Sequence, residues 1–380
     1  MKTGFVLVFF LFLFIQSAVA QFCANCIDIS AQKYSYKPSE RVLIFLDVLA
    51  ADIPDRKVDA YVAIIHPSGS TRFIYQISSW RVKDAKNKQV IIEPLENKEI
   101  GQYQLYFILA RIDSDPFDNN NWLAAKNIDI FLFPENWQAP RQEVIFSNNS
   151  GLPQLVAHGG GEVSGQLVTN SLQAIYNAYN RGQRFFELDF SWTADQKLVL
   201  IHDWDITYRR LFSQNAKAPN LKEFDQLLMN YGLTQLNFEQ LLSWLNDYPD
   251  VKVVTDIKDR NLEGLAYIAE RAGDAQKQFV PQIYAASEYN QAAKLGFKDI
   301  IFTLYRTDIS DSEVLDFVKK NTLFALTLPA NRAIKGSLAQ DLKGSGVFVY
   351  AHTVNHSEVY EYLQGRGVDG IYTDKLFPVE

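Results

Sequence analysis

The stretch that decides the fold is Phe185-Phe186-Glu187-Leu188-Asp189-Phe190. It is a short apolar run, as a buried strand requires, and it also carries two acids. Seven further short apolar runs lie before and after it, and the segments between the runs have the pattern of helices. Such alternation is typical of βαβ units and a parallel sheet. Strands are therefore predicted at residues 155–158, 185–190, 251–257, 279–283, 300–304, 323–327, 347–352 and 370–373.

Eight strand–helix units in about 225 residues predict an α/β domain of the TIM (β/α)8 barrel type. We place this domain at residues 154–380. A doubly wound open sheet could use the same alternation, so the pattern alone leaves that architecture open. The active site of a TIM barrel lies at the carboxyl ends of its strands. Polar side chains at those ends are therefore the candidates for function.

The preceding part of the chain has a different pattern. It consists of short alternating stretches, rich in β-branched and aromatic residues and broken by turns such as Pro67-Ser68-Gly69-Ser70. These features predict strands without helices, and hence a small all-β, sandwich-like domain at residues 21–140. The polar run Ser147-Asn148-Asn149-Ser150-Gly151 predicts a linker at residues 141–153.

The first 20 residues have the three parts of a secretory signal peptide, which are a basic start, an apolar run and the exit Ala18-Val19-Ala20. We therefore expect a secreted or periplasmic protein whose signal is cleaved near Ala20. A membrane anchor is disfavoured, because the run falls short of the ~20 apolar residues of a spanning helix. Cys23 and Cys26 are expected to form a small disulfide loop, although a redox or metal role stays open.

The charge of the chain bears on its partners. The formal net charge is −7, and the sequence contains no block of basic residues. A nucleic acid would find no basic run to neutralise its phosphates, which argues against nucleic acid as a partner. A small anionic substrate stays compatible with this composition, because local charges decide its binding.

Three acids predict a metal site. Glu187 and Asp189 lie two residues apart in a strand, so both carboxylates project from the same face. Adjacent acids repel each other unless a cation lies between them. With Asp256, at the end of the next predicted strand of the barrel, they provide three oxygen ligands, as Mg²⁺ or Ca²⁺ prefers. The two acids alone would also fit a pair of surface side chains on an edge strand.

Two histidines are candidates for acid–base catalysis. His158 and His202 are among only five histidines in the chain, and both fall at the ends of short predicted strands. The ordinary pKa of histidine suits proton transfer near neutral pH. A hydrogen-bonded core histidine is the alternative for either residue taken alone.

Taken together, the motifs resemble those of the glycerophosphodiester phosphodiesterase family. The resemblance covers about residues 152–380, and its motifs occur in the family's order. They are Ala157-His158-Gly159-Gly160, Thr169-Asn170-Ser171, Phe186-Glu187-Leu188-Asp189, the run 193–203 that ends in His202-Asp203, Asp256-Ile257-Lys258, the run 350–355, and the run 367–374.

This resemblance implies a TIM barrel with one divalent cation, Mg²⁺ or Ca²⁺, at Glu187, Asp189 and Asp256. It also implies that His158 and His202 act as acid and base. A secreted phosphodiesterase that cleaves glycerophosphodiesters or related phospholipid-headgroup or envelope phosphodiesters is therefore expected. Peripheral contact with a membrane or envelope is compatible with such a substrate, and the partner of the β domain is unknown.

The chain departs from the family in two places. The family usually has an arginine directly after the first histidine, where this chain has Gly159, and its third metal ligand is commonly glutamate, where this chain has Asp256. Backbone N–H groups at Gly159 and Gly160 could bind the phosphate instead. Lys258 and Arg306 are the side-chain candidates for the same role.

Two aromatic residues, Trp204 and Tyr305, are predicted to line the substrate cleft. The second functional hypothesis is a non-catalytic protein that binds an envelope lipid or glycan on a diverged barrel, because the arginine after His158 is missing.

Overall fold

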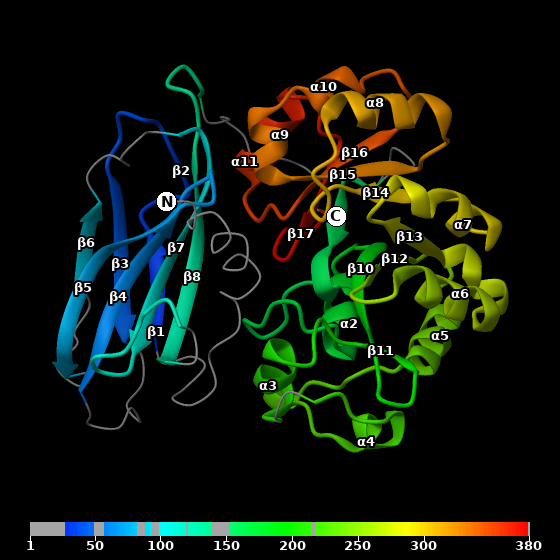
Figure 1. The fold of residues 1–380 in the computed structure, drawn as a ribbon, viewed down its shortest axis with the longest axis horizontal. Coiled ribbons are helices and arrows are strands. Elements are labelled where there is room, and N and C mark those ends of the chain that lie inside the picture. Colours follow the sequence, from blue (N-terminus) through cyan, green and yellow to red (C-terminus); the bar gives the residue numbers. More distant parts are fainter. Residues whose placement is uncertain are drawn as a thin grey trace, which may run out of the picture. The chain divides into compact units, whose positions relative to one another are not determined.

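The computed structural model describes residues 27–48, 57–81, 88–92, 99–118, 121–138, 153–214 and 217–378. The chain divides into two compact units at residues 139–140, and each is described by itself (Figure 1). The predicted signal peptide, the two cysteines and nearly all of the predicted linker lie outside the described residues. No helix in the described residues is long and apolar enough to span a membrane.

The first unit contains two β-sheets. The smaller has the order β1-β3-β6, and the larger has the order β2-β8-β7-β4-β5. Apolar residues from both sheets, such as Ile29 and Ile44 from one and Val62 and Leu105 from the other, pack into one buried core. The strands are β1 (Ile27–Ala31), β2 (Ser35–Tyr36), β3 (Val42–Val48), β4 (Lys57–Ile65), β5 (Thr71–Arg81), β6 (Lys88–Ile92), β7 (Gly101–Ala110) and β8 (Trp122–Leu132).

The second unit is a closed parallel barrel. Its strands follow the order β9-β10-β12-β13-β14-β15-β16-β17, and β9 pairs with both β10 and β17. This closure confirms the predicted barrel and excludes the open sheet. The strands are β9 (Leu155–Ala157), β10 (Phe185–Trp192), β12 (Lys252–Ile257), β13 (Phe279–Ile283), β14 (Ile301–Thr303), β15 (Ala325–Pro329), β16 (Phe348–His352) and β17 (Gly370–Thr373), with β11 (Leu198–Leu200) antiparallel to β10.

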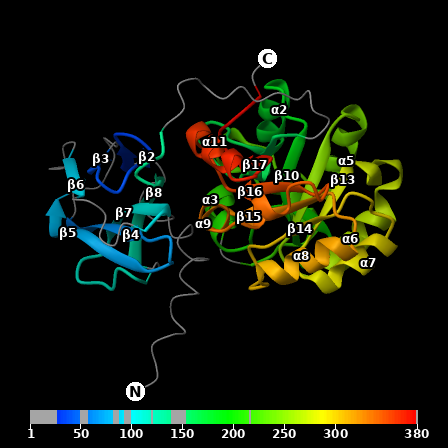
Figure 2. The same cartoon turned by 90° about the horizontal axis from the view of Figure 1, so that it is seen from above.

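Helices surround the barrel, as Figure 2 shows for α5 to α8. Several begin at a polar residue whose side chain accepts the backbone N–H of the third helical residue, as Ser171 does for α2 and Asn237 for α5. The helices are α2 (Leu172–Asn180), α3 (Ile206–Phe212), α4 (Leu221–Gln226), α5 (Phe238–Asp247), α6 (Asn261–Arg271), α7 (Tyr289–Lys294), α8 (Asp311–Lys320), α9 (Ala330–Lys335), α10 (Leu338–Asp341) and α11 (Ser357–Gly365).

The alternation of side chains along each strand positions the site. A buried cluster joins apolar side chains from seven of the barrel strands, and it includes Val156 of β9 and Val254 of β12. Residues two positions further along a strand point to the same side. His158 and Asp256 therefore lie on the side of this buried cluster, at the carboxyl ends of their strands.

A close backbone contact at Gly367, just after α11, yields a stability prediction. Gly367 has φ +96°, and a Cβ there would lie 2.8 Å from the carbonyl oxygen of Ala339. Gly344 has a similar φ of +85° but no heavy atom within 4 Å of such a Cβ. We expect Gly367→Ala to cost about 1–3 kcal/mol more than Gly344→Ala, because only the first forces packed backbone apart. Thermal unfolding followed by circular dichroism measures the difference, and equal losses would contradict it.

Candidate active site

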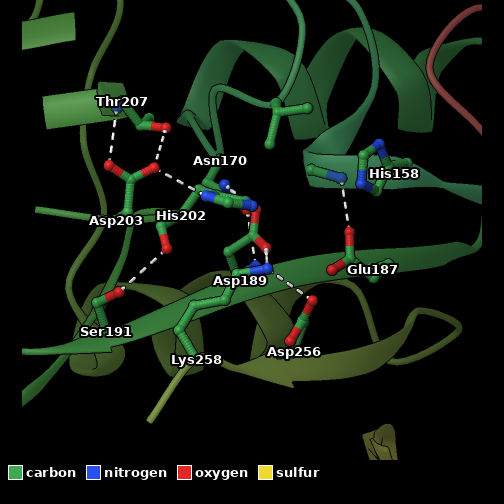
Figure 3. A network of polar contacts seen from close by, with 12 residues as sticks. His158, Asn170, Glu187, Asp189, Ser191, His202, Asp203, Thr207, Asp256 and Lys258 are labelled. Atoms are coloured by element: carbon green, nitrogen blue, oxygen red, sulfur yellow. Dashed lines mark hydrogen bonds and ion pairs between the residues drawn. The ribbon is translucent and has the colours of Figure 1, made fainter. Parts of the chain in front are cut away.

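The three predicted metal ligands lie together on two neighbouring strands. Glu187 and Asp189 belong to β10, and Asp256 belongs to β12, which pairs with it in parallel. One carboxylate oxygen from each lies within 4.8 Å of the others, and all three side chains are buried. The same-face prediction for Glu187 and Asp189 agrees with this placement (Figure 3).

Neutral donors hold two of these carboxylates. The Gly159 N–H donates to Glu187 Oε2 over 2.8 Å. The Asn170 amide donates to Asp189 Oδ2 over 2.7 Å and accepts the Asp189 N–H over 2.9 Å. Because Asn170 uses both ends of its amide on one residue, it sets the orientation of the Asp189 carboxylate.

Lys258 supplies positive charge between two of the acids. Its ammonium lies 2.6 Å from Asp189 Oδ1 and 2.7 Å from Asp256 Oδ2. Burial alone would lower the pKa of Lys258, but the two carboxylates hold it well above its ordinary value. Burial alone would raise the pKa of Asp256, but Lys258 and Arg306 hold it below its ordinary value.

Glu187 is the least compensated of the three acids. Within the described residues it makes no ion pair with a basic side chain. Burial and the neighbouring charge of Asp189 raise the pKa of Glu187 to about 8. Three buried carboxylates that converge, one of which has no ion-pair partner among the described residues, suit a hard divalent cation. Such cations prefer oxygen ligands.

Each predicted catalytic histidine is paired with an aspartate. His158 Nδ1 lies 2.8 Å from Asp374 Oδ1. Burial lowers the pKa of His158, but Asp374 and the acids of β10 raise it to about 9. Asn355 in turn donates its amide to Asp374 Oδ2 over 2.8 Å and accepts the Asp374 N–H over 2.7 Å. The imidazole ring is thus oriented through Nδ1.

His202 has the same kind of partner. Its Nδ1 lies 2.8 Å from Asp203 Oδ2, and the Thr207 hydroxyl donates to the same oxygen over 2.8 Å. The side chain of His202 is 35% exposed, whereas that of His158 is 16% exposed. His202 is therefore the more accessible of the two.

The backbone at Gly159 explains the missing arginine. Gly159 has φ +53°, and a Cβ there would lie 2.6 Å from Val168 Cα, so a side chain at this position would collide with backbone. The Gly159 N–H is engaged by Glu187, and the Gly161 N–H donates to the His158 carbonyl. Of the two backbone N–H groups predicted to bind phosphate, that of Gly159 is already used by Glu187. The N–H of Gly160 stays the predicted contact.

The other predicted residues fall into two groups. Tyr305 donates its hydroxyl to Asp256 Oδ2 over 2.6 Å, and the guanidinium of Arg306 lies 3.9 Å from Asp256 Oδ1, so both belong to the site. Trp204 instead donates to the backbone oxygen of Trp192 over 2.8 Å and packs on the buried cluster around Tyr208. Its contacts are those of a packing residue.

Sequence reasoning missed several residues of the site. Tyr284 donates its hydroxyl to Asp256, and the ring of His352 lies edge-on to His158 with centroids 4.7 Å apart. Asp374 and Asn170 are the partners described above. Their positions in the sequence could have identified three of them as candidates, because each lies at or just after the end of a barrel strand. These three are Tyr284, His352 and Asp374.

Restoring an arginine at position 159 tests the account of this loop. We expect Gly159→Arg to lower the free energy of unfolding by at least about 2 kcal/mol more than Gly165→Arg does. We also expect that Gly159→Arg does not raise the enzymatic activity of the protein. Gly165 is a matched control, because its φ is +72° and no heavy atom lies within 4 Å of a Cβ there. Chemical denaturation of both variants gives the comparison, and a stable Gly159→Arg protein would contradict the explanation.

Comparison with known proteins agrees with the motifs. Residues 160–299 match the model of the glycerophosphoryl diester phosphodiesterase family. The search of curated proteins gave no match.

Several solved structures are similar to the chain. A glycerophosphodiester phosphodiesterase from Thermotoga maritima is 21% identical, with a TM-score of 0.49, covering 58% of this chain and 94% of that one. One from Parabacteroides distasonis is 18% identical, with a TM-score of 0.47, covering 58% and 92%. An Oleispira antarctica phosphodiesterase, in complex with the product sn-glycerol-3-phosphate, is 19% identical, with a TM-score of 0.47, covering 59% and 94%.

The family match begins inside the glycine loop of His158 and extends over β10 and β12, the strands that carry the three acids. Residues 160–299 of the barrel are therefore similar to the glycerophosphoryl diester phosphodiesterase family.

Proposed function

We propose that the barrel hydrolyses glycerophosphodiesters or related phosphodiesters of phospholipid headgroups or envelope polymers. In this proposal a divalent cation and two histidines carry out the reaction. One observation carries it. Two histidines, each with Nδ1 held by an aspartate, flank one cluster of three buried carboxylates.

The cation, Mg²⁺ or Ca²⁺, would be held by Glu187, Asp189 and Asp256. When bound, it would withdraw electron density from the phosphoryl group and offset the negative charge of the site. Asn170 and the Gly159 N–H keep Asp189 and Glu187 oriented toward their common centre. Lys258 favours the ionised form of Asp189 and Asp256, which is the form that binds a cation.

The two histidines divide the proton transfers. With Nδ1 of each ring engaged, Nε2 is left to face the substrate. His158 is suited to donate a proton to the leaving alkoxide, since Asp374 at Nδ1 and the acids of β10 raise its pKa to about 9 and so favour the protonated ring. His202 is then the group that accepts the proton of the attacking hydroxyl.

The attacking hydroxyl is either water or a neighbouring hydroxyl of the substrate. In both routes its oxygen forms a bond to phosphorus, and the bond from phosphorus to the alkoxide breaks. Water yields a phosphomonoester, whereas a substrate hydroxyl yields a cyclic phosphate. Accumulation of a cyclic phosphate therefore identifies the second route, whereas a phosphomonoester is compatible with both, since water can open the cyclic phosphate.

Replacement of either histidine tests the catalytic assignment. We expect His158→Ala and His202→Ala each to lower kcat by about 10²–10⁴-fold, the usual range for loss of general acid–base catalysis. Cation binding should persist in both, because neither residue is a proposed ligand.

The assay uses glycerophosphodiesters, lysophospholipids and phosphodiester-linked envelope polymers, each with Mg²⁺, Ca²⁺ or chelator. Cation-dependent release of a phosphomonoester or cyclic phosphate that is lost in both variants supports the proposal. Silence of the folded, cation-loaded protein across all substrates would favour the non-catalytic binding role instead.

The partner of His158 yields a pH prediction. Asp374, Glu187 and Asp189 face His158 with negative charge, and His352 faces it as a ring whose pKa burial and His158 lower to about 3. Asp374→Asn removes the closest negative charge, so the pKa of His158 should fall from about 9. A general acid must be protonated, and the basic limb of the kcat profile should therefore move to lower pH. An unmoved basic limb would argue against His158 as the acid.

A further inference from the structure

The missing arginine leaves the question of which group binds the phosphate. Arg306 follows β14, and β14 stands four strands from β9 in either direction around the barrel. Arg306 therefore approaches the site from the side opposite the loop in which the family has its arginine. This placement makes Arg306 independent of the crowded backbone between Gly159 and Val168.

The N–H donors of Arg306 are available to a ligand. Within the described part of the chain, its guanidinium makes no hydrogen bond, and its nearest acid, Asp256, is 3.9 Å away. By contrast, Arg332 bonds to Asp311 and to a backbone oxygen, and Arg210 bonds to backbone oxygens. The Arg306 side chain is 34% exposed. A planar guanidinium whose N–H donors are free, next to the candidate active site, is suited to donate hydrogen bonds to a phosphate oxyanion.

Aromatic rings hold this guanidinium in place of hydrogen bonds. It lies over the ring of Tyr284, 4.4 Å from the centroid, and 5.5 Å from the centroid of Tyr305. A guanidinium on an aromatic face is attracted by the ring quadrupole and keeps its N–H edges free. Stacking therefore fixes the group without consuming the donors that phosphate would use.

The two tyrosines are themselves fixed. Tyr284 donates to Asp256 Oδ1, and Tyr305 donates to Asp256 Oδ2 over 2.6 Å. Tyr305 also stacks on His352 with centroids 5.6 Å apart and planes at 21°. Asp256 thus ties the rings to the proposed cation site, so the arginine and the cation would have a fixed relation to each other.

We propose that Tyr284 and Tyr305 are positioning residues that hold Arg306 as the phosphate-binding arginine of this chain, in place of the arginine absent at position 159. The inference rests on the proposed function and adds the group that binds the substrate's phosphate.

Phosphate binding tests the inference without any turnover. Inorganic phosphate is titrated calorimetrically into the Mg²⁺-loaded protein, and KM and kcat are measured with the best substrate of the panel. Arg306→Lys keeps the charge but loses the planar fork, and we expect it to raise Kd and KM at least about tenfold. Arg271→Lys is the matched control, because Arg271 also stacks on a tyrosine, Tyr267, but on the outer helix α6. It should change neither constant.

Two variants of Tyr284 separate the ring from the hydroxyl. Tyr284→Leu removes the stacking face and should raise Kd for phosphate as Arg306→Lys does, whereas Tyr284→Phe keeps the face and should raise it less. Added guanidinium ion should partly restore substrate turnover to Arg306→Ala and leave the Arg271→Ala protein unchanged. Thermal unfolding checks that each variant is folded.

The outcomes separate this inference from the proposed function. Wild-type phosphate affinity in Arg306→Lys, equal effects of Tyr284→Leu and Tyr284→Phe, or no phosphate binding by the wild type would each overturn the inference, even if the substrates are cleaved. Arginine-dependent phosphate binding by a protein that cleaves no substrate would support the inference and count against the proposed function.

Discussion

Mutual repulsion of three buried carboxylates is the constraint on which the rest of the site depends. Oxygens of Glu187, Asp189 and Asp256 lie within 4.8 Å of one another, out of contact with bulk water. Burying like charges together costs free energy unless donors and cations surround them. Lys258 and two tyrosine hydroxyls meet this need at Asp256, whereas within the described residues Glu187 accepts a hydrogen bond only from the Gly159 N–H.

The same constraint links the functional groups to each other. The loop that donates to Glu187 also carries His158, so the backbone conformation of Gly159 serves the acid and the histidine together. That conformation brings Val168 against the position where a side chain would begin, which removes the usual place for a phosphate-binding arginine. The tyrosines that donate hydrogen bonds to Asp256 then provide the surface on which Arg306 rests.

Short-range patterns explain which residues could be predicted. Glu187 and Asp189 share a face because they are two apart in one strand, and His158 and His202 were recognised at strand ends within motifs of fixed order. Tyr284 lies in no such motif, and His352 lies in the run 350–355 but was given no role; both follow strands that are distant in sequence from the acids. Trp204, whose place beside His202 predicts a cleft residue, packs against a buried cluster, and its role in the cleft stays a prediction.

By itself, the sequence determined the alternation of strands and helices, the acids and histidines at strand ends, and the all-β pattern of the first unit. These properties depend on residues close together in the chain. There the side chains alternate every two residues in a strand and repeat about every 3.6 residues in a helix, so the pattern can be read locally. Only the tertiary structure decided that the sheet closes, that Asp374 orients His158 across 216 positions, and that position 159 excludes a side chain. Closure of the barrel, the pairing of His158 with Asp374 and the steric exclusion at position 159 all depend on contacts between segments that are distant in sequence. The local periodicity of the sequence does not encode such contacts.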